Sequence, residues 1–218
     1  MMTRLIGVYG ASGFGREVMP VARVQYARDD VRLVFIDDNV AEPGTQINGH
    51  DILTWRAFVE QAENNGAVTV AIADAAVRER LIDRCAEAGV ASCDVRAANV
   101  VSGDNVSIGE GAILQPFVAL TADLRIGRGF HANIYSYVAH DCIIGDFVTF
   151  APGVKCNGNV HIGDGAYIGT GAILRQGTPD KPLMIGAGAT IGMGAVVTKD
   201  VPPGVTVVGN PARPLEKK

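Results

Sequence analysis

The stretch that decides the fold runs from Gly103 to Leu174 and reads, in blocks of six, GDNVSI GEGAIL QPFVAL TADLRI GRGFHA NIYSYV AHDCII GDFVTF APGVKC NGNVHI GDGAYI GTGAIL. An apolar residue closes every block, and a small or apolar residue stands two positions before it. Because alternate strand residues share a face, each block predicts one short strand with two inward-facing side chains. Three blocks, eighteen residues, then form one triangular coil of a parallel β-helix, in which each coil buries its inner face against its neighbours.

The corners and the end of this pattern carry further signals. Gly or Asn follows the closing residue at positions 109, 127, 133, 145, 157, 163 and 169, which predicts bends with positive φ there. After Leu174 the next closing residue is Ile185, eleven residues on where six are expected. The extra residues fall within Arg175–Pro182, which contains two prolines and a glycine and is expected to leave the coil as a loop. Such a loop is either a tolerated surface insertion or part of a binding face.

Length and composition bound the remaining possibilities. The blocks begin near residue 102 of 218, so we predict two domains, residues 1–97 and 98–218. No apolar run reaches the roughly 18 residues of a membrane helix, and the N-terminus leaves no room for a signal peptide, so we expect a soluble, cytoplasmic protein without membrane insertion. A net charge of −4 without a basic cluster argues against nucleic acid. The four cysteines lack metal-like spacing and are expected as small core residues.

The first half has the order of a Rossmann-like unit. The run Leu5–Tyr9 predicts a strand, Gly10–Gly15 a glycine turn and Arg16–Gln25 a helix. Backbone N–H groups at such a helix N-terminus bind phosphates, although glycines at 10, 13 and 15 only approximate the dinucleotide pattern. Pro20 is expected to kink this helix unless it lies in the first turn.

The following elements extend the α/β pattern. A second strand, Val31–Ile36, ends in Asp37-Asp38, where a Rossmann-like unit places an acidic contact to a nucleoside. A polar turn is the alternative interpretation of these carboxylates, and Asp74 and Arg78 carry the same ambiguity. Helices over 55–64 and 75–88 flank a strand over 68–72, which predicts a small parallel sheet. The half-domain is short for a dinucleotide, so a mononucleotide-like ligand is expected.

His140 is the strongest candidate for chemistry among the four histidines. It stands at a predicted corner, two residues after the closing Val138, with Asp141 beside it. A neutral imidazole accepts protons at neutral pH, and a carboxylate can orient it. His131 and His161 each precede a closing residue, point outward from the coil and are expected as solvated surface residues.

The eighteen-residue coil places Gly158 directly above His140. A free N–H at Gly158 could donate to an oxyanion that forms close to the imidazole. The alternative is that Gly158, in Asn157-Gly158-Asn159, is only a turn glycine. Cys142 and Cys156 occupy inward positions, which argues against a cysteine nucleophile and an acyl-enzyme.

Several motifs now carry a family resemblance. The blocks behind a small glycine-turn domain, the segment Tyr137–Cys142, Gly145-Asp146-Phe147 with Ala151-Pro152-Gly153, and Val208–Arg213 resemble the bacterial sugar acetyltransferases of the NeuD/PglD type. That family includes N-acetyltransferases of nucleotide-linked amino sugars and sialic acid O-acetyltransferases. The resemblance implies an α/β Rossmann-like domain followed by an all-β left-handed parallel β-helix. It also implies a homotrimer, acetyl-CoA as co-substrate between neighbouring helices, no metal, a nucleotide-linked amino sugar on the first domain, and a role in surface polysaccharide biosynthesis.

Site residues follow from the resemblance position by position. His140 resembles the catalytic base, Asp141 its acidic neighbour, Asn133 an active-site asparagine and Gly158 the oxyanion donor. The residues assigned to acetyl-CoA are Thr149, Thr170, Gly171, Lys199 and Arg213. The residues assigned to the nucleotide sugar are Gly10, Ser12, Gly13, Gly15, Asp37, Asp38 and Asp74. The chain departs from the family at Phe14 and Thr149, where the family commonly has histidine. Lys217 and Lys218 are expected as a solvated basic tail.

The sequence therefore predicts acetyl transfer from acetyl-CoA to the amino group of a nucleotide-linked amino sugar. In this hypothesis His140 removes a proton from the amine while the N–H of Gly158 stabilises the oxyanion. O-acetylation of a sugar hydroxyl needs the same groups and stays open. Two further alternatives are a non-catalytic nucleotide-sugar-binding protein and a zinc hydratase of the γ-carbonic anhydrase kind, which would need three imidazoles at one point.

Overall fold

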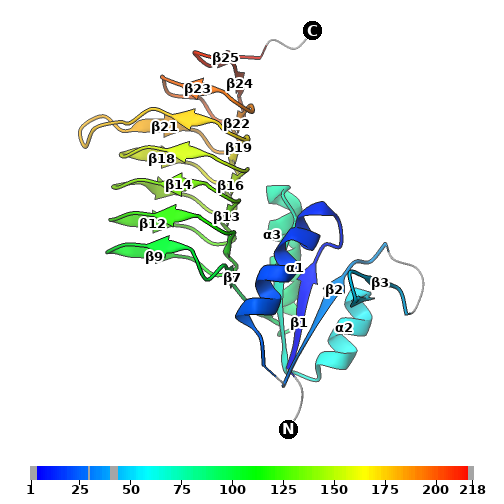
Figure 1. The fold of residues 1–218 in the computed structure, drawn as a ribbon. Helices are drawn as coiled ribbons and strands as arrows, with labels where there is room; N and C mark the ends of the chain where they lie inside the picture. Colours follow the sequence, from blue (N-terminus) through cyan, green and yellow to red (C-terminus); the bar gives the residue numbers. More distant parts are fainter. Residues whose placement is uncertain (1–3, 29, 40–43, 216–218) are drawn as a thin grey trace. The chain divides into compact units, whose positions relative to one another are not determined.

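The chain consists of two compact units in a computed structural model that describes residues 4–28, 30–39 and 44–215. The first unit is Met1–Ala97 with Glu110–Ile113, and the second is Ala98–Gly109 with Leu114–Lys218 (Figure 1). Lys217 and Lys218 lie outside the described residues. Within the described ranges, no helix combines the length and hydropathy that a membrane span requires.

The first unit is a three-layer α/β/α structure around a mainly parallel sheet of order β3-β4-β2-β1-β5-β6. Helix α1 packs Val18 and Met19 into one apolar cluster with Phe35, whereas α2 packs Trp55 and Phe58 into another on the opposite face. The alternation of strand and helix therefore buries both faces of the sheet, as parallel sheets require. The elements are β1 (Arg4–Tyr9), α1 (Gly13–Gln25), β2 (Val31–Ile36), β3 (Gln46–Ile47), β4 (His50–Leu53), α2 (Trp55–Ala62), β5 (Gly66–Val70), α3 (Ala75–Glu87) and β6 (Ala91–Ser92).

Two local features of this unit bear on the sequence prediction. Pro20 lies inside α1, beyond its first turn. The antiparallel hairpin of β3 and β4 was not predicted. Its turn, Asn48-Gly49, has positive φ at both residues, and this Asn-Gly pair is the sequence signal that identifies such hairpins.

The second unit is a parallel β-helix whose short strands stack into three sheets (Figure 1). β7 (Val95–Arg96) falls among the residues of the first unit. The first sheet of the β-helix contains β10 (Ile113–Leu114), β13 (His131–Ala132), β16 (Thr149–Phe150), β19 (Tyr167–Ile168), β22 (Thr190–Ile191), β24 (Thr206–Val208) and β25 (Arg213–Pro214). The second contains β8 (Val101–Ser102), β11 (Ala119–Leu120), β14 (Tyr137–Val138), β17 (Lys155–Cys156), β20 (Ile173–Leu174) and β23 (Val196–Val197). The third contains β9 (Val106–Ile108), β12 (Leu124–Ile126), β15 (Ile143–Ile144), β18 (Val160–Ile162) and β21 (Leu183–Ile185).

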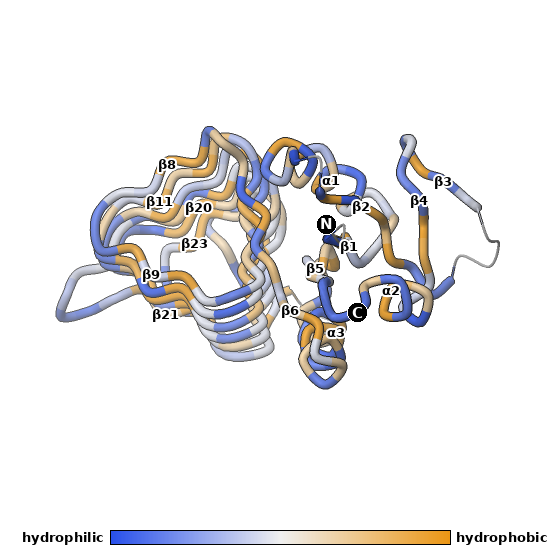
Figure 2. Tube along the Cα trace, turned by 90° about the horizontal axis from the view of Figure 1, so that it is seen from below, coloured by the Kyte–Doolittle hydropathy of each residue, from blue (hydrophilic) through white to orange (hydrophobic). Residues whose placement is uncertain are grey.

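The predicted eighteen-residue coil is observed directly in the strand register. Tyr137 pairs with Lys155, and Val138 pairs with Cys156, so each residue lies beside the one eighteen positions later. The inward positions form one continuous buried cluster along the stack, and Figure 2 shows the coils superimposed when viewed along it. The apolar ladder therefore forms the core of this unit.

The bends differ from the prediction in their position. The residues with positive φ are the third after each closing residue, for example Asp141 and Asn159, and not the first. Glycines in the first position are instead required by close packing, because a Cβ on Gly109 would lie 2.6 Å from the backbone nitrogen of Arg128 in the next coil. The left-handed position accepts aromatic residues as well, since Tyr135 has φ 59°.

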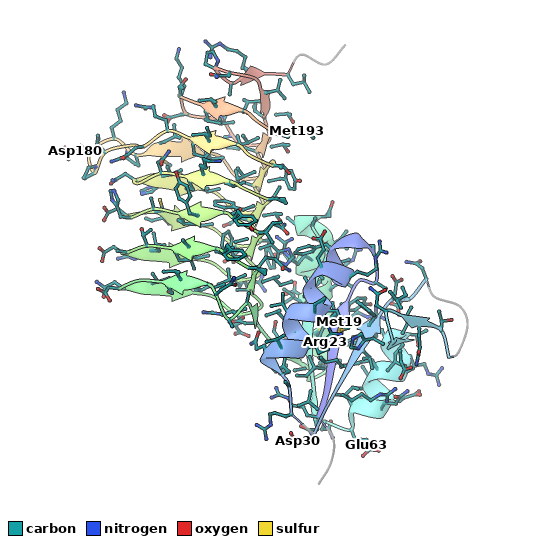
Figure 3. The ribbon with its side chains drawn as sticks, viewed as in Figure 1. Met19, Arg23, Asp30, Glu63, Asp180 and Met193 are labelled. Atoms are coloured by element: carbon teal, nitrogen blue, oxygen red, sulfur yellow. The ribbon has the colours of Figure 1, made fainter. Side chains whose placement is uncertain are left out.

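The loop Arg175–Pro182 leaves the coil as predicted. Across it the register step rises, because His161 pairs with Met184, twenty-three residues on. Thr178 and Lys181 exchange two backbone hydrogen bonds of 3.0 Å, which closes a short hairpin with Asp180 at its tip (Figure 3). The base of the loop rests on the coil below, where Gly177 N–H donates to Gly158 O at 2.9 Å.

Candidate active site

The β-helix brings an imidazole and a carboxylate together at one corner. His140 and Asp141 follow β14, and Asp141 adopts φ 57°, which turns the chain around the corner. The Nδ1 atom of His140 lies 2.7 Å from Oδ2 of Asp141. With the carboxylate ionised, Nδ1–H donates and Nε2 carries the free lone pair. About half of each side chain is exposed, so Nε2 can act as a proton acceptor for a ligand.

Gly158 lies against the face of this imidazole, one coil further on. A Cβ on Gly158 would lie 2.6 Å from Nε2 and 2.5 Å from Cε1 of His140, so only glycine leaves room for the ring. The backbone around it is held, since Asn159 N–H donates to His140 O at 3.0 Å. Among the described residues, the N–H of Gly158 donates to no protein acceptor. This N–H is available to a ligand beside the imidazole.

The strand register extends the same edge further along the stack. Val138, Cys156, Leu174 and Val197 are partners in successive coils. The residues two positions after them therefore form one column, which is His140, Gly158, Gln176 and Lys199. Coils lie about 4.8 Å apart, so Lys199 stands roughly 14 Å along the edge from His140 and is exposed. The loop Arg175–Pro182 emerges from this edge and not from another.

The other residues predicted for this site lie elsewhere on the coil. Asn133 stands at a different corner, where its Nδ2 donates to Phe150 O at 3.2 Å, and Thr170 and Gly171 belong to that same column of corners. Thr149 lies in β16 and is 3% exposed. Arg213 is exposed in β25. Within one chain, the structure joins His140 with Asp141 and Gly158 and does not join them with Asn133.

The remaining histidines require a correction. His131 was predicted to be solvated, but its side chain is completely buried, whereas His161 is partly exposed. The block pattern predicts which side chains point into the coil and which point outward. It does not predict whether an outward-pointing side chain is exposed to solvent. In the described part of the chain, no three His, Cys, Asp or Glu side chains gather as metal ligands.

Both cysteines near the corner are buried inside the coil, as predicted. A hydrogen bond between the two thiols lowers the pKa of Cys142 and raises the pKa of Cys156. The Cys142 thiol also donates to the carbonyl oxygen of Asn157 at 3.2 Å. Neither sulfur is exposed to a ligand at the His140 edge, so a nucleophilic thiol has no support in this geometry.

In the first unit, the glycine turn joins β1 to α1. Gly10 has φ 107°, a conformation that side chains disfavour. A Cβ on Gly15 would collide with Gly10 O, so this glycine lets the helix approach the strand closely. Ser12 is the N-cap residue and Gly13 is exposed with open space around it. The N-terminus of α1 is therefore open at Gly13, and a helix N-terminus suits an anion.

The two aspartates after β2 have different surroundings. Asp37 faces the glycine turn, where its Oδ2 accepts from Ala11 N–H at 3.4 Å. Asp38 accepts hydrogen bonds of 2.8 Å from Tyr9 Oη, Trp55 N–H and Arg84 Nη1. Desolvation acts to raise the pKa of Asp38, but these three donors outweigh it and hold the pKa below its ordinary value. Asp38 is thus held by three donors, and Asp37 is the carboxylate nearer the turn.

Asp74 caps α3 by accepting from Val77 N–H at 2.9 Å. Beside it, Asp38 and the outer face of α3 line a cavity of about 800 Å³. The residues lining it are Asp38, Ala76, Glu79, Arg80, Leu81, Asp83, Arg84 and Glu87. The glycine turn does not line this cavity, so the predicted phosphate site is separate from it.

Sequence reasoning missed two sets of residues. Tyr9 and Arg84 bind Asp38 from positions 29 and 46 residues away, and no local pattern signals such a contact. Tyr137 donates to Asn157 Oδ1 at 2.8 Å beside the His140 corner. The coil period could have indicated this second contact, because it places position 155 beside 137 and position 157 close by.

Known proteins resemble this chain over nearly its whole length. Residues 5–85 match the family described as the PglD N-terminal domain. The chain is 50% identical to GDP-perosamine N-acetyltransferase of Escherichia coli O157:H7, over 98% of this chain and 97% of that protein. The solved structure of WeeI from Acinetobacter baumannii AYE is 58% identical, with a TM-score of 0.94 over 98% of this chain and all of that one. PerB from Caulobacter crescentus, solved with CoA and GDP-perosamine, is 26% identical, with a TM-score of 0.84 over 97% of both chains.

The fold and the His140 corner define an acyltransferase built on a β-helix with a Rossmann-like unit before it. The chain belongs to the NeuD/PglD-type family of bacterial sugar acetyltransferases. The predicted fold class, an α/β unit followed by a left-handed parallel β-helix, is confirmed by this membership.

Proposed function

We propose that this chain transfers the acetyl group of acetyl-CoA to the amino group of GDP-perosamine. The E. coli relative is named for that reaction, and PerB is solved with CoA and the same nucleotide sugar. The observation that carries the proposal is the His140–Asp141 pair at 2.7 Å over the bare backbone of Gly158. It supplies a proton acceptor and a hydrogen-bond donor side by side, which aminolysis of a thioester needs.

The reaction proceeds by direct transfer. The sugar amine attacks the thioester carbonyl as Nε2 of His140 takes a proton from the nitrogen, and Asp141 stabilises the resulting imidazolium. The N–H of Gly158 donates to the oxyanion of the tetrahedral intermediate. Collapse breaks the carbon–sulfur bond, and the CoA thiolate takes the proton from His140. The products are an acetamido sugar and CoA, and no acyl-enzyme forms.

Each unit has its own role in this proposal. Residues 98–218 bind acetyl-CoA along the His140 edge, with Lys199 placed to meet its phosphates. Residues 1–97 bind the nucleotide sugar, with its phosphates at the N-terminus of α1 and its nucleoside near Asp37. We expect the enzyme in the cytoplasm, where acetyl-CoA and nucleotide sugars are present, and in surface polysaccharide biosynthesis.

A homotrimer is part of the proposal. Asn133 and Gly171 lie at a different corner from His140, so they can join the site only if a second copy brings its own corner to this edge. Exposed apolar side chains at the Asn133 corner, including Ile134 at 39% and Tyr135 at 63%, are compatible with such packing. Light scattering coupled to size exclusion tests it, and a monomeric mass with full activity would contradict it.

The test of the catalytic assignment compares two histidine variants. His140→Ala is expected to lower turnover by about two to four orders of magnitude, as loss of a general base does. His161→Ala removes a partly exposed imidazole from the same β-helix and is expected to leave turnover unchanged. Release of CoA with GDP-perosamine as acceptor is the assay. Turnover of His140→Ala within a few fold of the unaltered enzyme would remove His140 from the mechanism.

A further inference from the structure

A chain of hydrogen bonds runs beside the His140 corner and links two coils to a third. The hydroxyl of Tyr137, in β14, donates to Oδ1 of Asn157 at 2.8 Å. The Nδ2 of Asn157 donates to Leu174 O, also at 2.8 Å. Because the side-chain amide of Asn157 accepts one hydrogen bond through Oδ1 and donates the other through Nδ2, the two contacts together fix its orientation. Asn157 is the residue directly before Gly158.

The peptide bond between Asn157 and Gly158 has its direction set by a thiol inside the coil. Asn157 O accepts from the thiol of Cys142 at 3.2 Å, and Cys142 is fully buried. The carbonyl therefore points inward. In a planar trans peptide the N–H points opposite to the carbonyl, so the N–H of Gly158 points outward, on the side where the His140 ring lies.

The peptide on the other side of Gly158 is held as well. Gly158 O accepts from Gly177 N–H at 2.9 Å, and Asn159 N–H donates to His140 O at 3.0 Å. In the described part of the chain, every backbone group flanking the free N–H is thus occupied, and the side chain of Asn157 ties this turn to the His140 strand through Tyr137. Burial raises the pKa of Tyr137, so its hydroxyl stays protonated and remains a donor at the pH where His140 works.

We propose that Tyr137 is a positioning residue, which acts through Asn157 to hold the Gly158 N–H in line with the oxyanion; this inference rests on the proposed function. Tyr137 touches neither substrate nor reacting atoms. Its hydroxyl limits rotation of the Asn157–Gly158 peptide. When the Gly158 N–H is misaligned with the oxyanion, its hydrogen bond stabilises the oxyanion less. The effect is confined to the transition state, because the ground-state thioester carbonyl carries little charge.

Tyr137→Phe removes one oxygen atom and keeps the ring. We expect kcat to fall about tenfold while KM for acetyl-CoA and for GDP-perosamine stays unchanged, since the interaction affects the transition state only. We expect Tm to change little. The matched control is Tyr167→Phe, the same change on an exposed ring of the same β-helix, which is expected to keep full kcat.

A double-mutant cycle tests whether Tyr137 acts through Asn157. Asn157→Ala is expected to lower kcat at least as much as Tyr137→Phe does. In the Asn157→Ala background, Tyr137→Phe is expected to cost nothing further, because the acceptor of its hydroxyl is gone. Losses that multiply in the double variant would overturn the inference, and so would a kcat of Tyr137→Phe within twofold of the unaltered enzyme.

The same assays separate this inference from the proposed function. If the unaltered chain transfers no acetyl group to GDP-perosamine, the proposed function fails and this inference fails with it. If His140→Ala abolishes transfer but Tyr137→Phe keeps full kcat with unchanged Tm, the proposed function stands and only the role of Tyr137 is refuted.

Discussion

Replacing Gly158 with alanine places a methyl group where the His140 ring now lies. The new Cβ would be 2.5 Å from Cε1, 2.6 Å from Nε2 and 3.0 Å from Nδ1 of the imidazole. Non-bonded carbon contacts are favourable at about 3.5–4.0 Å, so the ring must move by roughly 1 Å. This shift changes the geometry of the 2.7 Å contact between Nδ1 and Asp141 Oδ2. The N–H of residue 158 itself is retained, so the substitution tests the position of the base.

The expected cost of this shift is catalytic and not structural. A displacement of about 1 Å in a reacting group costs about a hundredfold in rate, which corresponds to about 2.7 kcal/mol in the activation free energy. The clash is with the end of a half-exposed side chain, which can rotate away, so Tm is expected to stay nearly unchanged. The assay measures CoA release at saturating acetyl-CoA and GDP-perosamine, with Tm as the control for folding. A folded Gly158→Ala enzyme with kcat within threefold of the unaltered one would refute the reasoning.

Three further predictions concern Asp37, Asp38 and Lys199. Asp37→Asn is expected to raise KM for the nucleotide sugar about tenfold, the effect of about 1.4 kcal/mol, with Tm unchanged; equal KM values would exclude a nucleoside contact. Asp38→Asn is expected to lower Tm, and this loss of Tm should shrink as the pH is lowered. A carboxylate of lowered pKa stabilises the fold above about pH 3.9 and loses this effect as the pH falls through its pKa in the folded protein. A loss of Tm that is constant with pH, or that Asp180→Asn at the hairpin tip also shows, would argue against this. Lys199→Ala is expected to raise KM for acetyl-CoA about tenfold with kcat unchanged, whereas Arg125→Ala, on another face, should leave both constants unchanged.

The sequence predicts the β-helix well because its period is a physical repeat. Each closing residue must point inward in every coil, so the spacing alone places His140 under Gly158 and shows which edge the loop Arg175–Pro182 leaves. Strand and helix alternation likewise predicts the first unit, apart from the short β3–β4 hairpin. These features depend on local geometry repeated along the chain.

The errors arise where a residue depends on something outside this period. The residue with positive φ is the third in each block and not the first. Glycine in the first position is required by close packing between coils, and not by its backbone freedom. His131 faces outward but is buried, since facing outward does not ensure contact with solvent. The pairing of Asp38 with Arg84, 46 residues away, was likewise not predicted. Side-chain contacts over such separations have no periodic signal.

The most direct measurement of the central claim is the structure of the product formed from acetyl-CoA and GDP-perosamine. We predict one acetyl group on the sugar amine, seen by mass spectrometry and by NMR as an amide that survives mild hydroxide treatment, and its absence with His140→Ala. A product that loses its acetyl group in hydroxide, and is therefore an ester on a sugar hydroxyl, would contradict the account, as would CoA release without any acetylated sugar.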